Sequence, residues 1–269
     1  MKIKKLSKYL GVEISDINLS KLTLLDFKKI DELLLKYHFL CFKKQKLSPQ
    51  NQIKFSKFWG ELEISDTLPI DKKFKEVSYI IREACDVKCY GGGWHFEYGA
   101  HKIGAMGLVL HALEIPETGG ETQFINMINM YEKLSFEDKQ LLENVKVKKK
   151  LSHKLAQKYA SDKFLNKMKK IEFENIVPII KVHPKTNQKI LNVDIGFTDS
   201  IIGEKIKNKN KLLNKLKDNL NNSEFIYTHK WEVGDVIFFD NRCVLHKAVD
   251  NYNSRRVIQR TLIKENSIE

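Results

Sequence analysis

The chain has 269 residues and a formal net charge of +13, with 42% hydrophobic residues, 30% charged residues, four cysteines and five prolines. This length and apolar fraction suit one domain with its own core, and they exclude disordered, collagen-like and disulfide-rich classes. No segment approaches the roughly 18 apolar residues of a membrane span, and the first residues lack the apolar run of a signal peptide. We therefore expect a cytoplasmic protein in which residues 1–269 form a single domain.

The cysteines and basic residues argue against several classes of function. Cys41, Cys85, Cys89 and Cys243 form no CxxC pair, which favours reduced, packed thiols over a zinc or redox site. The basic residues comprise 42 lysines and five arginines, and much of the lysine lies in the stretches 146–170 and 205–222 without interleaved aromatic residues. This pattern favours a solvated surface over a nucleic-acid interface. Four of the five arginines lie between 242 and 260, where a planar fork for a carboxylate would be useful.

The first half of the chain alternates helical and extended patterns. Apolar spacing predicts a helix over 22–39 that runs into an extended segment, FLCFKKQ. A second helix is expected after Ser48, with Pro49 in its first turn and Gly60 beyond its end. The segments VSYII, GAMGLVLHALEI and TQFINM predict strands, and a helical insert is expected from about 128 to 170, with Ser135 and Asp138 as a capping box.

The second half is mainly extended. PIIKVHP and KILNV predict two strands joined by a turn at KTNQ, and a basic helix is expected over about 203–222. The last fifty residues read as strands and turns, in FIYTHKW, GDVIFFDN, CVLHKAV and RRVIQRTLIK. The fold class is therefore α+β and mainly β: a sheet-rich core of the two-sheet jelly-roll type, with helices packed outside and the helical insert.

One short motif could hold a metal ion. In GGGWHFEYG, His95 and Glu97 stand two residues apart, so in an extended segment both side chains leave the same face. An imidazole and a carboxylate at this spacing provide two ligands of the 2-His-1-carboxylate set that holds Fe(II). Because a His-x-Glu pair also arises by chance, the interpretation needs a third ligand.

His246, in the strand-like CVLHKAV, is the best third ligand. The arginines Arg256 and Arg260 follow it at an even separation, so they share one face of the next strand and suit an acidic co-substrate. The other histidines are weaker candidates: His111 lies in an apolar strand and suits the core, and His153 and His229 lie among lysines and are expected to be exposed. The remaining three are His38, His101 and His183.

At this point the chain resembles the taurine dioxygenase family of Fe(II)- and 2-oxoglutarate-dependent oxygenases, which includes dichlorophenoxyacetate dioxygenase. The resemblance runs nearly end to end. It is carried by LGVEISDINLS, FKKQKLSPQNQIKFSKFWGEL, WHFE, EIPETGGETQF, MYEKLS, VHPKTNQKILNV, GFTDSIIG, GDVIFFDNRCVLHKAV and RRVIQRTLI. It implies a double-stranded β-helix fold, with Fe(II) as cofactor and 2-oxoglutarate and O2 as co-substrates.

The resemblance also implies a role for each matching residue. Those roles are iron ligands for His95, Glu97 and His246, binding of the far carboxylate of 2-oxoglutarate for Thr122 and Arg256, and contact with the substrate for Arg260 and Phe197. The implied reaction hydroxylates an unactivated C–H bond of a small anionic or amino-acid-like substrate and releases succinate and CO2. Relatives of this type are often oligomers, so a homo-oligomer is possible.

Two departures from the family pattern bear on the substrate and the reaction. Most members have Asp where this chain has Glu97; a carboxylate there favours oxygenation over halogenation, since the halogenases have a small residue. Positions that contact taurine also differ, with Gly91 where an Asn is expected and Ser65 and Leu68 about where a His and a Tyr would lie, so taurine is a poor candidate.

Three other functions stay open at this point. The chain could be a nucleic-acid-binding protein that uses its lysine-rich surface, an oxidative demethylase of nucleic-acid bases, or a zinc hydrolase with the same three ligands. The demethylase lacks an evident aromatic platform for a flipped base. The hydrolase leaves Arg256 and Thr122 without a task.

Overall fold

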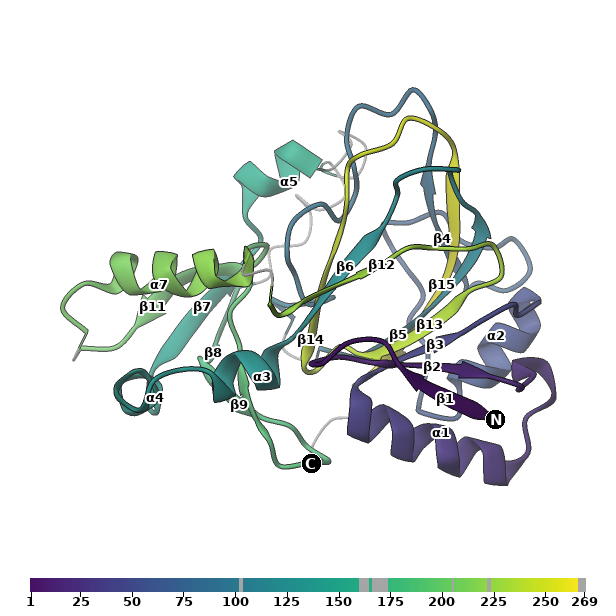
Figure 1. The fold of residues 1–269 in the computed structure, drawn as a ribbon. Coiled ribbons are helices and arrows are strands. Elements are labelled where there is room, and N and C mark those ends of the chain that lie inside the picture. Colours follow the sequence, from purple (N-terminus) through teal and green to yellow (C-terminus); the bar gives the residue numbers. More distant parts are fainter. Residues whose placement is uncertain (102–103, 160–164, 166–173, 205, 222–223, 266–269) are drawn as a thin grey trace.

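The computed structural model describes residues 1–269 except 102–103, 160–164, 166–173, 205, 222–223 and 266–269. Figure 1 shows a strand-rich body that contains the first and the last strand of the chain. Beside it lies a smaller group of strands and helices drawn in teal and green. Among the described residues, no helix combines the length and the apolar character that crossing a bilayer requires.

The body is built on a seven-stranded sheet. Neighbouring strands run antiparallel except for the parallel pair β2 and β3. In spatial order the strands are β1 (Lys2–Lys5), β2 (Val12–Ser15), β3 (Phe39–Phe42), β13 (Val236–Asp240), β5 (Ala105–Glu114), β15 (Arg256–Lys264) and β4 (Ser78–Arg82). The expected strands at 77–81, 104–115, 234–241 and 255–264 are therefore confirmed.

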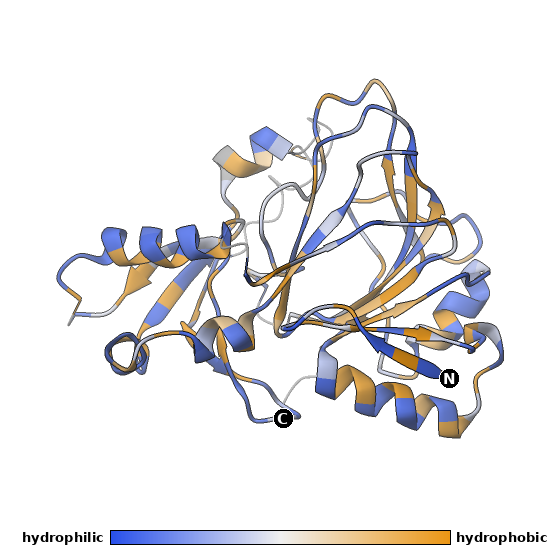
Figure 2. Cartoon of the chain, in the orientation of Figure 1, coloured by the Kyte–Doolittle hydropathy of each residue, from blue (hydrophilic) through white to orange (hydrophobic). Residues whose placement is uncertain are grey.

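Two helices cover one face of this sheet, after the short 3-10 turn η1 (Leu19–Lys21). The helix α1 (Leu24–Tyr37) confirms the helix expected over 22–39, and α2 (Pro49–Ser56) begins where Ser48 accepts a hydrogen bond from the backbone N–H of Asn51 at 3.2 Å. Figure 2 shows α1 with an apolar and a polar side. Its apolar residues join a core that includes β3 and β13.

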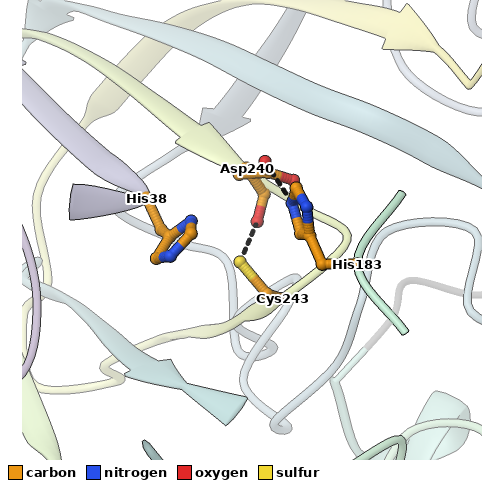
Figure 3. A group of neighbouring side chains, drawn as sticks. All are labelled: His38, His183, Asp240 and Cys243. Atoms are coloured by element: carbon orange, nitrogen blue, oxygen red, sulfur yellow. Dashed lines mark hydrogen bonds and ion pairs between the residues drawn. The ribbon is translucent and has the colours of Figure 1, made fainter. Parts of the chain in front are cut away.

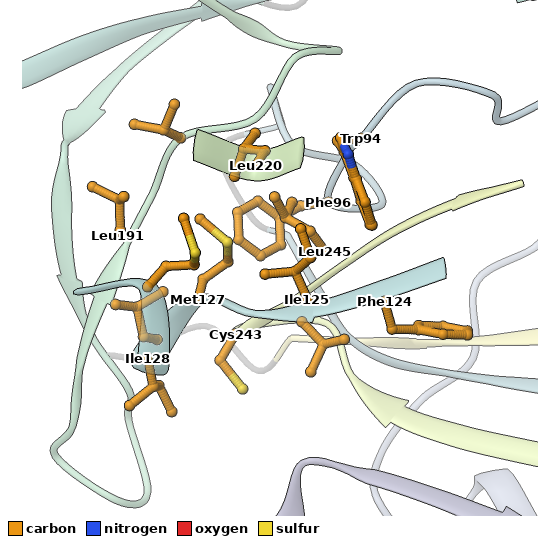
Figure 4. Close-up of a cluster of buried hydrophobic side chains, with 14 of the residues drawn as sticks. Trp94, Phe96, Phe124, Ile125, Met127, Ile128, Leu191, Leu220, Cys243 and Leu245 are labelled. Atoms are coloured by element: carbon orange, nitrogen blue, oxygen red, sulfur yellow. The ribbon is translucent and has the colours of Figure 1, made fainter. Parts of the chain in front are cut away.

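A three-stranded sheet packs against the other face of the seven-stranded sheet. It consists of β12 (Ile226–His229), β6 (Thr122–Asn126) and β14 (Val244–Ala248), paired antiparallel with β6 in the middle. The ring of Phe124 on β6 meets Phe39 at 4.7 Å and Phe239 at 5.4 Å between ring centroids. Figure 4 shows part of the large core cluster, which includes Phe124 and Ile125 of β6 and Met127 and Ile128 of the following helix α3 (Met127–Glu132).

The strand β15, next to the edge strand β4, is buried on both faces, and its alternating side chains contact different groups on the two faces. Gln259 and Thr261 face α2, where Gln52 and Ser56 bond to them at 2.7 and 2.6 Å. The other set carries Arg256 and Arg260 toward the space between the two sheets, where each meets the groups described below. The sheet thus places both arginines in one interior.

The smaller group of elements combines two small sheets with short helices. It contains a three-stranded sheet ordered β11-β7-β8 and a hairpin of β9 and β10, covered by short helices. Its members are α3 (Met127–Glu132), α4 (Phe136–Leu142), β7 (Lys146–Lys150), α5 (His153–Tyr159), β8 (Glu174–Pro178), β9 (Ile180–Val182), β10 (Lys189–Leu191), β11 (Thr198–Ile202), α7 (Lys209–Asp218) and η2 (Asn219–Asn221).

The helical insert expected over 128–170 is therefore partly wrong. The lysine-rich segment KVKKK forms strand β7 rather than helix, because it pairs on both sides and buries Val147 and Lys149 on one face. Tertiary pairing here outweighs the helical preference of lysine. Of the expected capping box, the Ser135 half is confirmed, since its hydroxyl accepts from the N–H of Asp138 at 3.0 Å; the Asp138 carboxylate instead accepts from Lys215 at 2.8 Å. Residues 160–164 and 166–173 of the expected insert lie outside the described residues.

The two other expectations for this group are confirmed in outline. The strands on either side of KTNQ pair as the hairpin β9–β10. The basic helix is α7, shorter than expected, with Asn208 as its N-cap and η2 continuing to Asn221. Leu213 and Leu216 point into the core, while Lys209, Lys211 and Lys215 are exposed and Lys217 is half-buried; Figure 2 shows the two-sided colouring of the helix.

Candidate metal centre

The site begins with a single bridge between two distant segments. His95 and His246 exchange both backbone hydrogen bonds, N–H to O, each at 3.1 Å. Residues that pair in this way lie directly opposite each other, so their side chains leave the same face. The two imidazole rings stand 4.2 Å apart between centroids. One histidine from the loop after β4 and one from β14 are thus held side by side.

The third candidate residue is fixed through its backbone. Asn241, in the turn between β13 and β14, accepts from the N–H of Glu97 at 2.8 Å and donates to its carbonyl oxygen at 3.0 Å. The same side chain amide also donates to the carbonyl of Ala105 at 3.0 Å. These bonds set the orientation of the Asn241 amide and lock the position from which the Glu97 carboxylate extends.

One ligand atom from each of His95, Glu97 and His246 lies within 4.8 Å of the other two. The Nδ1 atom of His95 contacts the carbonyl of Gly93 at 2.7 Å, which leaves Nε2 as its free ring nitrogen. Burial, together with the charges of His95 and Arg260, holds the pKa of His246 well below its usual value, so its ring is neutral. Two imidazoles and one carboxylate are the donors that suit Fe(II), so these residues fit that ion.

Arg260 is engaged with this group. Its Nη2 lies 3.0 Å from Oε1 of Glu97, and its Nη1 donates to the hydroxyl of Ser78 at 3.2 Å. Ser78 stands directly opposite Arg260 in the pairing of β4 with β15. The arginine expected to face the substrate is therefore bonded, in this structure, to the candidate metal-ligand carboxylate.

Arg256 and Thr122 form a second polar contact nearby on the same face of β15. The hydroxyl oxygen of Thr122 accepts from Nη2 of Arg256 at 3.2 Å and from Nε1 of Trp231 at 2.9 Å. Both bonds use lone pairs of the oxygen, so the hydroxyl hydrogen remains available to donate. Arg256 is only 6% exposed, and its Nε is buried without a hydrogen-bond partner. A buried, incompletely bonded guanidinium is suited to an anion.

Sequence reasoning missed the groups that surround Arg256. Arg82 pairs with it directly across β4 and β15, so the two guanidinium groups share one face. Arg82 is bonded to Asp250 at 2.6 Å and stacks on the ring of Tyr252 at 4.4 Å. The sequence did contain a signal for Arg82, since it is the one arginine outside 242–260. That Arg82 lies opposite Arg256 could not be predicted without the strand register.

Phe197 lies on a turn that packs against the ligand segment. The backbone N–H groups of Ile195 and Gly196 both donate to the carbonyl of Trp94 at 3.0 Å. A methyl group added to Gly99 would come within 2.7 Å of the Phe197 ring, and one added to Gly196 would lie 3.2 Å from Cβ of His95. The Phe197 turn therefore covers the segment that carries the candidate ligands.

Two other clusters contain metal-ligating residue types, and in each of them the carboxylate is already hydrogen-bonded to several protein groups, although His38 Nδ1 is buried without a partner. In the group His38, His183, Asp240 and Cys243 of Figure 3, Asp240 accepts from His183 Nε2 at 2.9 Å and from three groups of Arg242. The Nδ1 atom of His183 accepts from two backbone N–H groups.

In the second of these clusters, which also includes Cys41, Asp235 bonds to Lys43, His229 and the N–H of Glu232. Both clusters are hydrogen-bonded structural networks.

The structure tests the expectations for the other histidines and the cysteines. His111 is buried in β5, as expected. The exposed position expected for His229 is wrong: it is 4% exposed, because β12 turns it inward to bond with Asp235 at 3.1 Å. The side chain of His153 lies outside the described residues. The cysteines are free thiols, of which Cys85 alone is exposed.

The chain matches a known protein family over most of its length. The family model described as taurine catabolism dioxygenase TauD, TfdA family matches residues 2–262. The chain belongs to this family. It is accordingly a 2-oxoglutarate-dependent dioxygenase that uses Fe(II), 2-oxoglutarate and O2.

Individual relatives of this dioxygenase are distant but cover nearly its full length. A (S)-phenoxypropionate/alpha-ketoglutarate-dioxygenase from Sphingobium herbicidovorans is 27% identical, over 88% of this chain and 85% of that protein. An alkylsulfatase from Acinetobacter baylyi is 28% identical, over 97% of this chain and 84% of that protein. Among solved structures, a taurine dioxygenase from Burkholderia xenovorans is 25% identical with a TM-score of 0.83, covering 98% of this chain and 91% of that one.

Proposed function

We propose that His95, Glu97 and His246 hold the Fe(II) of this dioxygenase. The supporting observation is the His95–His246 bridge, which brings two imidazoles and the Glu97 carboxylate together from separate segments. His246 Nδ1 is buried without a hydrogen-bond partner, and His95 uses Nδ1 for its contact with the carbonyl of Gly93, so each ring can offer a nitrogen to a metal ion. Three ligands of this kind leave positions open for a co-substrate and oxygen.

Arg256 and Thr122 bind the far carboxylate of 2-oxoglutarate in this proposal. Both present unused hydrogen-bond donors, from the guanidinium and from the hydroxyl, in an interior where water is scarce. A carboxylate there gains charge-assisted hydrogen bonds and neutralises a buried cation. Trp231 supports the site by fixing the Thr122 hydroxyl and by lying 5.7 Å from the Arg256 guanidinium.

Arg260 and Phe197 face the substrate. The Nη1 of Arg260 is bonded to a neutral serine hydroxyl, which an anionic group of the substrate could replace at a gain in energy. Relatives are named for action on phenoxypropionate, 2,4-dichlorophenoxyacetate and sulfonates, and each of these carries an acidic group. We therefore infer a small anionic or amino-acid-like substrate.

The reaction of the proposal is hydroxylation of an unactivated C–H bond. Bound iron and 2-oxoglutarate supply the oxidant, with release of succinate and CO2. The protein's own residues orient the reactants: Arg256 and Thr122 fix one end of the co-substrate, and Arg260 fixes the substrate. The Phe197 turn excludes water from the ligand segment by packing over Gly99.

We also infer the finer description of the fold. The seven-stranded sheet and the sheet β12-β6-β14 face each other across Phe39, Phe124 and Phe239. This arrangement supports a double-stranded β-helix, with residues 1–269 as one domain. The likeness to the taurine dioxygenase structure, at a TM-score of 0.83, supports the same inference.

Anaerobic titration of the protein with Fe(II) and 2-oxoglutarate tests the site. We expect the weak visible charge-transfer band of a chelated keto acid, weakened in the Arg256→Ala variant because the far carboxylate loses its partner. His95→Ala should abolish the band and substrate-dependent succinate formation. A full band in folded His95→Ala protein would contradict the ligand assignment. Shifts of the wild-type band on adding sulfonates, phosphonates or amino acids would then identify the substrate class.

A further inference from the structure

We propose that Arg260 is a positioning residue for the Glu97 carboxylate, and that the length of the glutamate side chain brings the two within reach. The inference rests on the proposed role of Glu97 as a metal ligand and adds to it. Arg260 holds one carboxylate oxygen, so the other oxygen is left for the metal ion.

The ion pair is close and largely buried. Nη2 of Arg260 lies 3.0 Å from Oε1 of Glu97, and the two side chains are 4% and 12% exposed. A surface pair at this distance would be screened and mobile, but a pair shielded from water keeps its strength and its geometry. The bond therefore restricts where the Glu97 carboxylate can point.

Arg260 is itself well anchored. It lies on β15, which is paired on one side with β5 and on the other with β4. Its second nitrogen, Nη1, donates to Ser78 Oγ at 3.2 Å, directly across from it on β4. The planar guanidinium therefore spans two groups at once, which the single ammonium of a lysine does not reproduce.

The Glu97 backbone cannot move to compensate for a shorter side chain. Its N–H and its carbonyl oxygen are both bonded to Asn241, at 2.8 and 3.0 Å. An aspartate at this position would withdraw the carboxylate by one carbon–carbon bond of about 1.5 Å, which breaks a contact of hydrogen-bond length. Glu97 and Arg260 therefore act as a matched pair, and the contact exists only with glutamate at position 97.

Arg260 is placed to orient a metal ligand through a hydrogen bond. Groups that hydrogen-bond a metal ligand fix its orientation, and their loss typically weakens metal binding about 10- to 100-fold. With Oε1 of Glu97 occupied by Arg260, Oε2 is the oxygen that remains free for a metal ion. Arg260 thus has two tasks, one toward Glu97 through Nη2 and one toward the substrate through Nη1.

The test is a double-mutant cycle on metal affinity without 2-oxoglutarate. The full chain, stripped of metal, is titrated with Mn(II), and free Mn(II) is followed by its electron paramagnetic resonance signal. The proteins are the wild type, Arg260→Lys, Glu97→Asp and the double variant. Arg260→Lys keeps the positive charge, so it removes the fork but leaves the local field nearly unchanged.

We expect Arg260→Lys to raise the Kd for Mn(II) about tenfold when residue 97 is glutamate. In the Glu97→Asp background the same change should alter the Kd less than twofold, because the contact is already absent. Equal losses in the two backgrounds, or no loss with glutamate, would overturn the proposal.

Arg256→Lys is the matched control, because Arg256 lies on the same face of β15 but bonds to Thr122 instead of Glu97. Its Kd should stay within twofold of the wild type. If Arg260→Lys does not fold, as judged by circular dichroism, the same cycle is run with Arg260→Gln against Arg256→Gln. Retained Mn(II) binding in His95→Ala would refute the metal site itself, whereas loss there with none in Arg260→Lys would refute only the positioning role.

Discussion

At the scale of single residues, the polar groups buried between the sheets fall into two kinds. Asp240 accepts hydrogen bonds from His183 and from the backbone and side chain of Arg242, so its oxygens are fully used. Arg256, in contrast, keeps a buried nitrogen without a partner. Because burying an unpartnered polar group costs free energy, the incompletely bonded guanidinium of Arg256 is suited to an anionic ligand, whereas the satisfied carboxylate of Asp240 stabilises the fold.

His38 makes the stability of the folded protein depend on pH. Burial lowers its pKa from 6.5 to about 4, so the folded state resists a proton that the unfolded chain accepts. This contribution to stability is complete above about pH 6.5, and it is lost as the pH falls through about 4, amounting to about 3 kcal/mol.

The His38→Asn variant should lose much less stability than the wild type between pH 7 and pH 4, measured by urea unfolding. Asparagine suits the site because His38 has a φ of 59°, in the left-handed region that Asn tolerates. An equal fall in both proteins would show that His38 does not titrate in this way. The comparison also removes the contribution of His246, which both proteins share.

Several residue-scale interpretations could be made from the sequence and others could not. The spacing of His95 and Glu97 is local, and the even separation of Arg256 and Arg260 defines one strand face, so both were readable. The partners Ser78, Arg82 and Asn241 come from other segments, and only the strand register shows which of them meet the site. The same limit explains the wrong expectation for His229.

At the scale of elements, the turn after β10 links the smaller group of elements to the candidate metal centre. Asp194 accepts from the N–H groups of Phe197 and Thr198, and its other oxygen pairs with Lys149 of β7 at 2.5 Å. Lys149 and Asp194 are 1% and 0% exposed, so this is a buried ion pair. Through the turn it supports Gly196, which lies against His95.

Replacing Lys149 by Met should destabilise the protein by about 3–5 kcal/mol, because Asp194 would remain as an uncompensated buried charge. Adding Asp194→Asn should recover most of this loss, since the amide oxygen still accepts from Phe197 and Thr198 without a charge. Urea unfolding of the single and double variants measures both effects. If the double variant is less stable than Lys149→Met, the charge is not the cause.

The elements themselves were predictable where the local pattern agreed with the tertiary environment. The apolar stripe of α1 and the alternation in β15 led to the right assignments. The segment KVKKK did not, because its strand conformation depends on pairing with β8 and β11. A pattern of lysines carries no period that would reveal such partners.

At the scale of the whole molecule, the proposed ligands join parts of the chain that are far apart in sequence. The metal site connects the loop before β5 with β14, and the Arg256 site connects β15 with β6. Binding at either place stabilises the folded state and has no counterpart in the unfolded chain. Ligands should therefore raise the unfolding temperature of the protein as a unit.

Mn(II) at about 100 times its Kd should add about 2.7 kcal/mol, which corresponds to a rise of about 5 °C in Tm. The 2-oxoglutarate analogue N-oxalylglycine should raise the Tm further once the metal is bound. In His95→Ala the Mn(II) shift should disappear, whereas Arg256→Ala should keep the metal shift and lose that of the analogue. Calorimetry distinguishes these cases, and shifts of equal size in all three proteins would indicate binding elsewhere.

The sequence alone was enough to establish the mainly β architecture, the candidate ligands and the resemblance to an oxygenase family, because periodicity and short motifs are properties of local chain geometry. The tertiary structure alone decided which side chains meet. It brought His246 beside His95, placed Arg82 opposite Arg256, and paired Arg260 with Glu97. Strand register sets these contacts, and a shift of one residue would turn each side chain to the opposite face.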